Sequence, residues 1–420
     1  MSAPTRGALA SRENSEPRDK PESRDNSESH NNSESRASHE SQDALQSPGA
    51  AATMIVSVII PARNEAAAIA GVVHAVRAQQ LGAHTEIEVI VVDDGSSDDT
   101  AERAAAAGAR VVRRGESEGN PAAARNAGAR AARGDPLVFL DADCTPAPGW
   151  LDALLSGHAR GAAVVGGALE MAPGLPITAR CDYYATSTQQ HARRPAGRVV
   201  SQSPASLSVR RDAFFATCGF IERHPVADGH EELAWQGALT RAGEQIIFEP
   251  RAVAYHRNRA GLAHLLRRSY RWGYSSIEAK ALSGAARVAT LYRHPRLLVA
   301  AALPLSAAHT LHALTSWMRA GRVEPLVLAP GILAARIAYA CGMMIGGIRW
   351  LRRTERSSAE RSSAERTSPE RTSARRTGAE HASTGLARAE YTRAEYTSTD
   401  GTRAEQSGAD ASGDDRPRWR

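Results

Sequence analysis

Cysteine is scarce in this chain, and its distribution argues against stabilisation of the fold by disulfides or by a structural zinc ion. The 420 residues contain four cysteines, which lie far apart and form no CxxC pair. They are Cys144, Cys181, Cys218 and Cys341. A disulfide framework or a structural zinc site would need closely spaced cysteines, so we expect neither. The pattern is typical of a protein in a reducing compartment.

Two further absences narrow the function. The first residues are polar and carry both charges, with no apolar run, so we expect no cleavable secretory signal. Zinc-finger spacing and an aromatic RNA-binding signature are also missing. The net charge is +6 and the pI about 9.4, with basic residues gathered at 251–271 and 349–353. An anionic lipid surface or a diphosphate explains this pattern at least as well as nucleic acid, which we do not expect as a partner.

Both ends of the chain are poor in apolar residues. Residues 1–53 are rich in Ser, Glu and Arg, and residues 354–420 carry a drifting "ERSSA" repeat. Such segments bury too little apolar surface to offset the entropy of ordering them. We predict two disordered tails around a folded part, with a main domain at 54–285 and an apolar helical region at 286–353.

Short apolar runs alternate with helical patterns in the first part of the main domain. The predicted strands lie within 54–65, 86–96, 110–114 and 136–144, and the predicted helices within 65–79, 98–109 and 120–135. This alternation indicates an α/β fold with right-handed βαβ units and a doubly wound, mostly parallel sheet. Ligands bind such sheets beyond the carboxyl ends of the strands. Acids follow three of these strand ends, namely Glu65, Asp93, Asp94, Asp141 and Asp143.

The second half of the chain is less regular. It predicts a strand and short helix in 205–220, a helix and strand in 230–250, a strand in 251–259 and a basic helix in 261–282. Two apolar stretches follow, at 296–318 and 325–353, and the second ends in Trp350 and several arginines. The second is long enough to cross a bilayer and has the flanks of an interfacial anchor. We expect this region to associate with a membrane, spanning it or lying on it; the alternative is a helical hairpin packed on the core.

Four motifs in order carry a resemblance to a known family. They are "VSVIIPARNE", "IVVDDGSSDDT", "ARNAGARAARGD" and "LVFLDADC". Their type and spacing resemble the family 2 glycosyltransferases, over about residues 55–275. The resemblance implies the GT-A nucleotide-sugar-binding fold. It also implies transfer of a sugar from a nucleoside diphosphate sugar to an acceptor hydroxyl, with inversion at the anomeric carbon.

The DxD motif of the family corresponds to Asp141 and Asp143 in "VFLDADCTP". Carboxylates cannot bind an anionic diphosphate directly, but a divalent cation resolves the conflict. Mg²⁺ or Mn²⁺ takes oxygen ligands from carboxylates, phosphates and water, and stabilises a leaving diphosphate. His256, which follows a predicted strand, is a weaker metal-ligand candidate, because a structural histidine would give the same pattern. The alternative for the motif is that one aspartate caps the following turn.

The other motifs imply a donor site. Asp93 and Asp94 match the acidic motif that contacts the base and ribose, and a carboxylate suits this because it accepts hydrogen bonds. The alternative is that "DDGSSDD" forms a turn and caps a helix, and both roles can hold together. Pro61, Ala62 and Glu65 match the loop that lines the nucleotide pocket, although Glu65 could serve only as a helix cap.

Arg125 in "AAARNAG" also matches a donor-binding position of the family. A guanidinium suits the geometry of a phosphate. The alternative is a solvated arginine on the surface of a helix.

An inverting transferase needs a general base for the acceptor hydroxyl. The family places it in an acidic pair, often Glu-Asp, that opens a helix, and the matching stretch here is "DGHEELAWQGAL". The pair is Glu231 and Glu232, which departs from the usual Glu-Asp. We favour Glu231, then Glu232, with Asp228 and His230 as further alternatives. Acids at a helix start are also favoured by the helix dipole alone.

The stretch "RRSYRWG" resembles the Q/RxxRW motif of processive family members. The resemblance gives Arg268, Arg271 and Trp272 roles at the acceptor sugar and the diphosphate. Aromatic faces pack on sugar rings, and arginine neutralises a diphosphate. The same basic helix would also suit a membrane surface.

Together these features predict a metal-dependent inverting glycosyltransferase of hexosyltransferase type at the cytoplasmic face of the cell membrane. Its donor would be a UDP-, GDP- or dTDP-sugar, and its acceptor a lipid-linked or polysaccharide hydroxyl of the cell envelope. Because few candidate spanning helices are present, addition of one sugar is favoured over polymer export. The alternatives are a nucleotidyltransferase, although "PARNEAAA" lacks a Gly-rich loop with lysine, and an inactive GT-A-fold binding protein.

Overall fold

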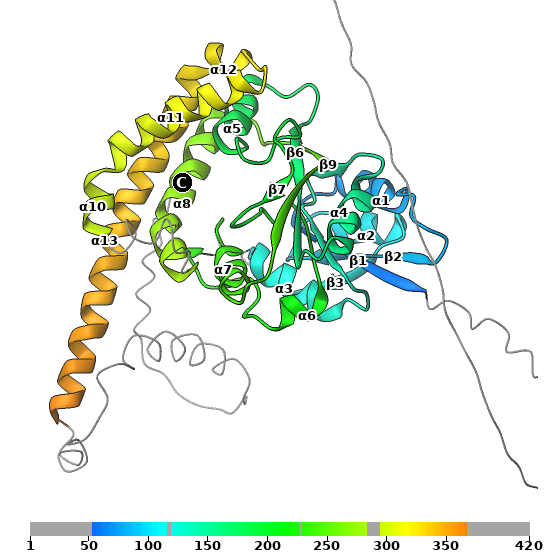
Figure 1. Cartoon of the computed structure of the whole chain (residues 1–420), viewed down its shortest axis with the longest axis horizontal. Coiled ribbons are helices and arrows are strands. Elements are labelled where there is room, and N and C mark those ends of the chain that lie inside the picture. Colours follow the sequence, from blue (N-terminus) through cyan, green and yellow to red (C-terminus); the bar gives the residue numbers. More distant parts are fainter. Residues whose placement is uncertain (1–52, 116–118, 227–228, 284–294, 368–420) are drawn as a thin grey trace, which may run out of the picture. The chain divides into compact units, whose positions relative to one another are not determined.

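A computed structural model describes residues 53–115, 119–226, 229–283 and 295–367 (Figure 1). The predictions for residues 1–52 and 368–420 lie outside the described residues. Residues 116–118, 227–228 and 284–294 also lie outside them, and with them the predicted domain boundary at 285.

The first four strands form a parallel sheet joined by helices, as the alternating pattern predicts. Strands β1 (Met54–Ala62), β2 (Thr85–Asp93), β3 (Arg110–Arg113) and β4 (Leu137–Leu140) lie in the order β3-β2-β1-β4. All three pairings among them are parallel. The connecting helices are α1 (Ile69–Arg77), α2 (Thr100–Ala106) and α3 (Pro121–Ala131).

The sheet is buried on both faces. Alternate side chains of β1 point to opposite sides: Val58 and Ile60 lie in one apolar cluster with Trp150, whereas Ile59 lies in another with Trp235. A parallel sheet with helices on both faces has this pattern. The apolar run of β1 therefore reflects two buried faces, and the strand ends are the places where polar groups reach solvent.

The second half extends the sheet to nine strands and makes it mixed. The further strands are β5 (Cys144–Pro146), β6 (Val164–Met171), β7 (Gly197–Arg198), β8 (Ser206–Val209) and β9 (Ile246–His256). The complete order is β3-β2-β1-β4-β8-β6-β9-β5, with β7 also paired to β9. Strand β8 runs antiparallel to β4 and β6, while β6 and β9 are parallel.

The prediction of two strands in the region 246–259 is wrong in one respect. Residues 246–256 form the single strand β9, whose register against β6 shifts between Gly167 and Ala168. The irregularity lets one strand continue through a stretch containing Pro250. The helices of this half are α4 (Trp150–Ala159), α5 (Ile177–Thr186), α6 (Arg211–Phe215), α7 (Leu233–Arg241) and α8 (Leu262–Ser283).

The two apolar stretches near the C-terminus are helical. They form α10 (Pro295–Ala300), α11 (Ala302–Arg319), α12 (Glu324–Val327) and α13 (Ala329–Thr367). Helix α13 continues beyond residue 353, so the predicted start of a disordered tail at 354 falls inside a helix. Its part Ala329–Ala359 is long and apolar enough to cross a membrane. Helix α13 lies beside α8 (Figure 1).

A buried carboxylate anchors the amino-terminal edge of the sheet. Glu88 on β2 accepts hydrogen bonds from Ser57 (2.5 Å), from Arg133 and from Arg110 (2.9 Å). Although burial opposes ionisation, these bonds lower the pKa of Glu88 to about 2. The carboxylate thus ties β1, β3 and the end of α3 to one point on β2.

We predict that Glu88→Gln lowers the free energy of unfolding by roughly 2–3 kcal/mol at pH 7. The carboxylate has an ordinary pKa in the unfolded chain and a lower one when folded, so its stabilisation is complete above about pH 4.5. It is lost as the pH falls towards 2. Urea unfolding at several pH values measures this.

The matched control is Glu86→Gln, which changes an exposed residue of the same strand. It should leave the free energy of unfolding nearly unchanged. Equal destabilisation by the two variants at pH 7 would contradict the stabilising role of the Glu88 carboxylate. So would a loss of unfolding free energy in Glu88→Gln that persists at pH 2.

Candidate active site

The two DxD aspartates lie between β4 and β5 and face different partners. Asp141 accepts a hydrogen bond from the Arg125 guanidinium at 2.5 Å. Asp143 lies 3.4 Å from Nε2 of His256. The antiparallel pairing of β5 with β9 sets Cys144 opposite His256, and the Arg257 N–H donates to the Asp143 carbonyl at 2.9 Å. The strand register therefore brings an aspartate and a histidine 113 positions apart into contact.

Asp143 and His256 have the donor atoms of a divalent-cation site. Their ligand atoms and the Cys144 sulfur all lie within 4.8 Å of one another. Burial raises the pKa of the Cys144 thiol well above its ordinary value, so it stays protonated and is a poor ligand. A carboxylate oxygen and an imidazole nitrogen remain, a set that suits Mn²⁺ or Mg²⁺ completed by phosphate and water oxygens. The residues present fit the metal that the motif predicts.

A hydrogen-bond chain fixes the orientation of His256. Its Nδ1 lies 2.9 Å from Oδ1 of Asn258, and the Asn258 amide nitrogen donates to Asp182 at 2.8 Å. Because a carboxylate only accepts, the Asn258 oxygen must face the imidazole. Nδ1 then carries the proton and Nε2 is directed to Asp143. Sequence reasoning missed Asn258 and Asp182.

The same chain reaches α8. Arg268 pairs with the buried Asp182 at 2.5 Å and stacks over the Trp272 ring, 4.1 Å from its centroid. Trp272 also packs against Gly229, where a Cβ atom would come within 2.3 Å of the indole nitrogen. The structure thus brings Arg268 and Trp272 to the histidine side of the site. Arg271 is exposed on the same helix.

Arg125 joins the DxD motif to the acidic pair before α7. Its buried guanidinium donates to Asp141 and to Glu231, each at 2.5 Å. Burial alone would lower the pKa of Arg125, but Asp141 and Glu231 outweigh it and raise the pKa. Arg125 therefore stays charged, and it is a buried ion-pair partner, not a solvated helix residue.

The two glutamates differ in their surroundings. Glu231 is buried against Arg125, and its second carboxylate oxygen has no hydrogen-bond partner among the described residues. Burial raises its pKa while Arg125 opposes the shift. Glu232 is half-buried, and burial together with the charge of Glu231 raises its pKa to about 8. In the described part of the chain, Glu232 makes no salt bridge.

The helix after this pair starts later than predicted. Helix α7 begins at Leu233, with Glu232 at the N-cap, so the acids precede the helix. His230 lies 2.9 Å from the Ser275 hydroxyl, and burial lowers its pKa to about 3, which makes it a poor base. Asp228, the other alternative, lies outside the described residues.

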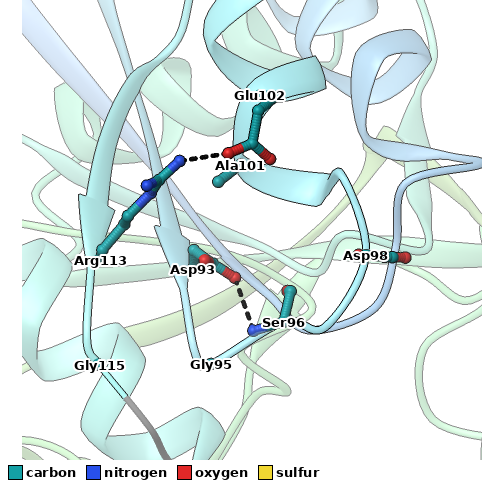
Figure 2. A pocket seen from close by; sticks show the side chains of 8 residues that line it. All are labelled: Asp93, Gly95, Ser96, Asp98, Ala101, Glu102, Arg113 and Gly115. Carbon is teal, nitrogen blue, oxygen red and sulfur yellow. Dashed lines mark hydrogen bonds and ion pairs between the residues drawn. The ribbon is translucent and has the colours of Figure 1, made fainter.

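A pocket of about 440 Å³ opens beside the end of β2 (Figure 2). Asp93 lies in its wall and accepts a hydrogen bond from the Ser96 N–H at 3.1 Å. Figure 2 shows Arg113 directed towards Glu102 on another wall, and the two form an ion pair at 2.5 Å. The lining residues are Asp93, Gly95, Ser96, Asp98, Ala101, Glu102, Arg113 and Gly115.

Asp94, in contrast, braces the loops beside this pocket. Its carboxylate accepts from Arg114 at 2.5 Å and from the Asn120 N–H, and Asn120 caps α3. The Asp94 N–H donates to the carbonyl of Ala62. Ala62 is buried, and its neighbour in the chain, Pro61, is half-buried. Asp94 and the end of β1 therefore hold the loops that shape the pocket.

Glu65 connects the pocket side to the histidine side. Its carboxylate pairs with Arg259 at 2.6 Å, and its N–H donates to Thr100 at 2.8 Å. Burial raises the pKa of Glu65 even though Arg259 opposes it. Glu65 therefore fixes the loop after β1 against the segment that follows β9. This ion pair is a contact beyond the helix cap that was the alternative role for Glu65.

Comparison with known proteins identifies the family. The family described as glycosyl transferase family 2 matches residues 57–213. Glycosyltransferase AglE of Haloferax volcanii is 32% identical over 231 residues, which cover 53% of this chain and 73% of AglE. A pre-mycofactocin glycosyltransferase of Mycobacterium tuberculosis is 29% identical over 302 residues, or 69% of this chain. The chain spans only about half of that relative, 54% of its length.

One solved structure with a similar fold is mannosyltransferase PcManGT from Pyrobaculum calidifontis, in complex with GDP-Man and Mn²⁺. It is 21% identical, with a TM-score of 0.46, and the match covers 69% of this chain and 86% of that one. The sequence relatives and the architecture described above are sufficient for the assignment. The chain belongs to the family 2 glycosyltransferases, and the GT-A fold class predicted from its motifs is confirmed.

Proposed function

We propose that this protein transfers a single sugar from a nucleoside diphosphate sugar to an acceptor hydroxyl, with inversion at the anomeric carbon. The observation that carries the proposal is that two groups of polar residues meet at the DxD motif. One is the Asp143–His256 pair, and the other is Asp141 with Glu231 and Glu232 around Arg125. The reaction needs a metal ion to stabilise the leaving diphosphate and a general base to deprotonate the acceptor, and these two groups of residues could supply both.

The donor would bind along the strand ends. Its nucleoside would occupy the pocket beside Asp93, whose carboxylate can accept from a base N–H or a ribose hydroxyl. The pocket alone is compatible with a UDP-, GDP- or dTDP-sugar. Pro61, Ala62 and Glu65 would form the neighbouring wall, and Asp94 would support it from behind.

The diphosphate would lie near the DxD motif. Asp143 and His256 would hold Mg²⁺ or Mn²⁺, which when bound neutralises charge that develops on the leaving diphosphate. Arg125 stays charged and lies against Asp141, so it supplies a second cationic group on the same side. Arg271 on α8 is exposed and would add positive charge at the acceptor side.

Glu232 is the better candidate for the general base, which reverses the order that the sequence favoured. Glu231 is committed to Arg125, whereas Glu232 is half-buried and makes no salt bridge in the described part of the chain. Glu231 then has two roles: it holds Arg125, and its charge raises the pKa of Glu232. Glu232 would accept the proton of the acceptor hydroxyl as the oxygen attacks the anomeric carbon.

The acceptor would enter over Trp272. An indole face packs well against a sugar ring, and Arg268 holds this indole from one side. The acceptor would be a lipid-linked or polysaccharide hydroxyl of the cell envelope. The apolar helix α13 beside α8 supports a place at the cytoplasmic face of the membrane.

We predict hydrolysis or transfer of at least one UDP-, GDP- or dTDP-sugar that requires Mn²⁺ or Mg²⁺. Asp143→Asn removes the carboxylate ligand and should lower kcat/KM roughly 100-fold or more. Release of the nucleoside diphosphate measures turnover. The control Asp152→Asn, an exposed acid on α4, should keep full activity.

Two results would contradict this proposal and favour an alternative. Exchange between a nucleoside triphosphate and a sugar phosphate would indicate a nucleotidyltransferase. Metal-dependent donor binding in a thermal shift assay, with no turnover of any donor, would indicate an inactive binding protein.

We predict that kcat/KM rises with pH, up to a plateau above about pH 8. Glu232 has a raised pKa of about 8, so its basic form is the minor one below that pH. Glu232→Gln should remove this limb and lower the plateau about 100-fold. Glu231→Gln removes the neighbouring charge, which should lower the pKa of Glu232 and move the limb to lower pH. If Glu231→Gln instead removed the pH-dependent limb and Glu232→Gln only moved it, Glu231 would be the base.

We predict that Asn258→Ala weakens Mn²⁺ binding about 10- to 100-fold, because Nδ1 of His256 loses the acceptor that fixes its orientation. Titration of the protein with Mn²⁺ alone, followed by electron paramagnetic resonance, measures this without any turnover. The control Gln189→Ala removes an exposed amide and should leave Mn²⁺ affinity unchanged. Unchanged Mn²⁺ affinity in Asn258→Ala would exclude the positioning role.

A further inference from the structure

The described helices after residue 295 carry much of the exposed apolar surface. On α13, Leu333, Ile337, Ile345 and Ile348 are each 40–51% exposed. Their spacing of four, eight and three residues places them along one side of the helix. Ile332, Ala335, Ala340 and Met343 are buried on the other side. An apolar stripe of this length on a helix that already has a packed face marks an interaction surface.

The elements that contact α13 carry further exposed apolar side chains. Leu303, Leu311 and Met318 are exposed on α11, and Val323 and Val327 are exposed at and beside α12, with Val327 reaching 82%. These residues and the four of α13 are called the apolar face below. In the described part of the chain, no element covers them.

The charged residues of the segment that carries the apolar face are almost all positive. Residues 295–353 contain seven arginines, one glutamate and no lysine or aspartate. The glutamate, Glu324, pairs with Arg180 and accepts from the Tyr184 hydroxyl, so it is committed to α5. Arg319 and Arg352 are exposed. An apolar face with a cationic border is complementary to an anionic lipid surface.

Helix α13 is long enough to span a bilayer, but its packing on the main domain excludes that orientation. Close glycine contacts hold it along its length. A Cβ atom on Gly331 would come within 2.5 Å of the Cys181 sulfur of α5. On Gly342 and Gly346 it would come within 2.0 Å of the Tyr270 and Tyr274 carbonyls of α8. The apolar part of α13 therefore lies directly against α5 and α8.

These two helices cannot follow α13 into hydrocarbon. Helix α5 contains Asp182, and α8 contains Arg268 and Glu278, all of them charged groups tied to the main domain. Asp182 is also hydrogen-bonded to Asn258 beside the candidate metal pair. A spanning α13 would place these charges and the strand-end site inside the bilayer, which is strongly unfavourable.

We propose that the apolar face lies in the plane of an anionic membrane surface, so that the protein binds the bilayer from one side without crossing it. This inference deepens the proposed function, on which it rests for the membrane location of the acceptor. Helix α8, which carries Trp272, packs on α13 and is therefore held close to the lipid surface. An acceptor anchored in that leaflet reaches the site without leaving the membrane.

Vesicle sedimentation of the full chain tests the proposal. We expect binding to vesicles of 30% phosphatidylglycerol and 70% phosphatidylcholine that is at least tenfold stronger than to phosphatidylcholine alone. Alkaline carbonate should release the bound protein from cell membranes. The double variant Ile337→Glu/Ile345→Glu places charge at two exposed positions, so the fold tolerates it, and vesicle binding should fall at least tenfold.

Val200→Glu is the matched control, since Val200 is 67% exposed and lies outside the apolar face. It should bind vesicles as the unchanged protein does. Resistance to carbonate extraction, absence of vesicle binding, equal binding to both vesicle types, or equal loss in the control would each overturn the proposal.

Hydrolysis of the donor in solution without vesicles separates this inference from the proposed function. The double variant should keep the metal-dependent donor hydrolysis of the unchanged protein. Hydrolysis without vesicle binding in the unchanged protein would overturn the docking surface alone. Vesicle binding without hydrolysis or transfer of any donor would overturn the proposed function and leave the surface supported.

Discussion

The arrangement of the site depends on a single buried cation. Arg125 lies on α3, in the first half of the chain, and binds Asp141 at the end of β4 and Glu231 before α7. A buried guanidinium is tolerated only when carboxylates compensate it, and buried carboxylates need a cation for the same reason. The three groups therefore fix one another, and they draw the DxD loop and the acidic pair into one place. Removing Arg125 would leave both carboxylates without the cation that compensates them.

A second constraint comes from strand register. Strand β9 pairs with β6 on one side, and its last three residues also pair with β5 on the other side. The second pairing brings His256 to Asp143. The irregularity between Gly167 and Ala168 permits this, because the pairing with β6 resumes at Val253 after Pro250. A change in that register would move His256 to the other face of the strand and separate it from the aspartate. The candidate metal pair is thus a property of the sheet as much as of its two residues.

The sequence was informative where function depends on neighbours along the chain. Acids directly after β1, β2 and β4 could be placed at one edge because parallel strands end at the same edge. The strand–helix alternation before residue 144 has the same local origin, since each element shows its own periodicity. Fold class followed from these two signals, and so did the proposal that a donor binds at the strand ends.

Contacts that depend on tertiary packing could not be predicted. Asp182 pairs with Arg268, 86 positions away, and with Asn258, 76 positions away, and nothing near Asp182 in the sequence signals either contact. The distinction between Asp93, in the pocket wall, and Asp94, bound to Arg114, depends on which way two adjacent side chains turn. The proposed order of Glu231 and Glu232 differs from the order that the sequence favoured for the same reason, because the partner of Glu231 lies on a distant helix. Burial and partners, which decide pKa values, are not local properties of a sequence.

The apolar helices and the strand-end site are parts of one contact network. Helix α13 packs on α8 through Gly342 and Gly346, and α8 carries Arg268, which binds Asp182. Asp182 holds Asn258, and Asn258 orients the histidine that faces Asp143. Each link is a close packing contact, a hydrogen bond or an ion pair between described residues. A substitution that enlarges Gly342 would therefore shift α8 and disturb the orientation of His256. For this reason the C-terminal helices belong to the architecture of the site, although the residues that line the pocket beside Asp93 come from other elements.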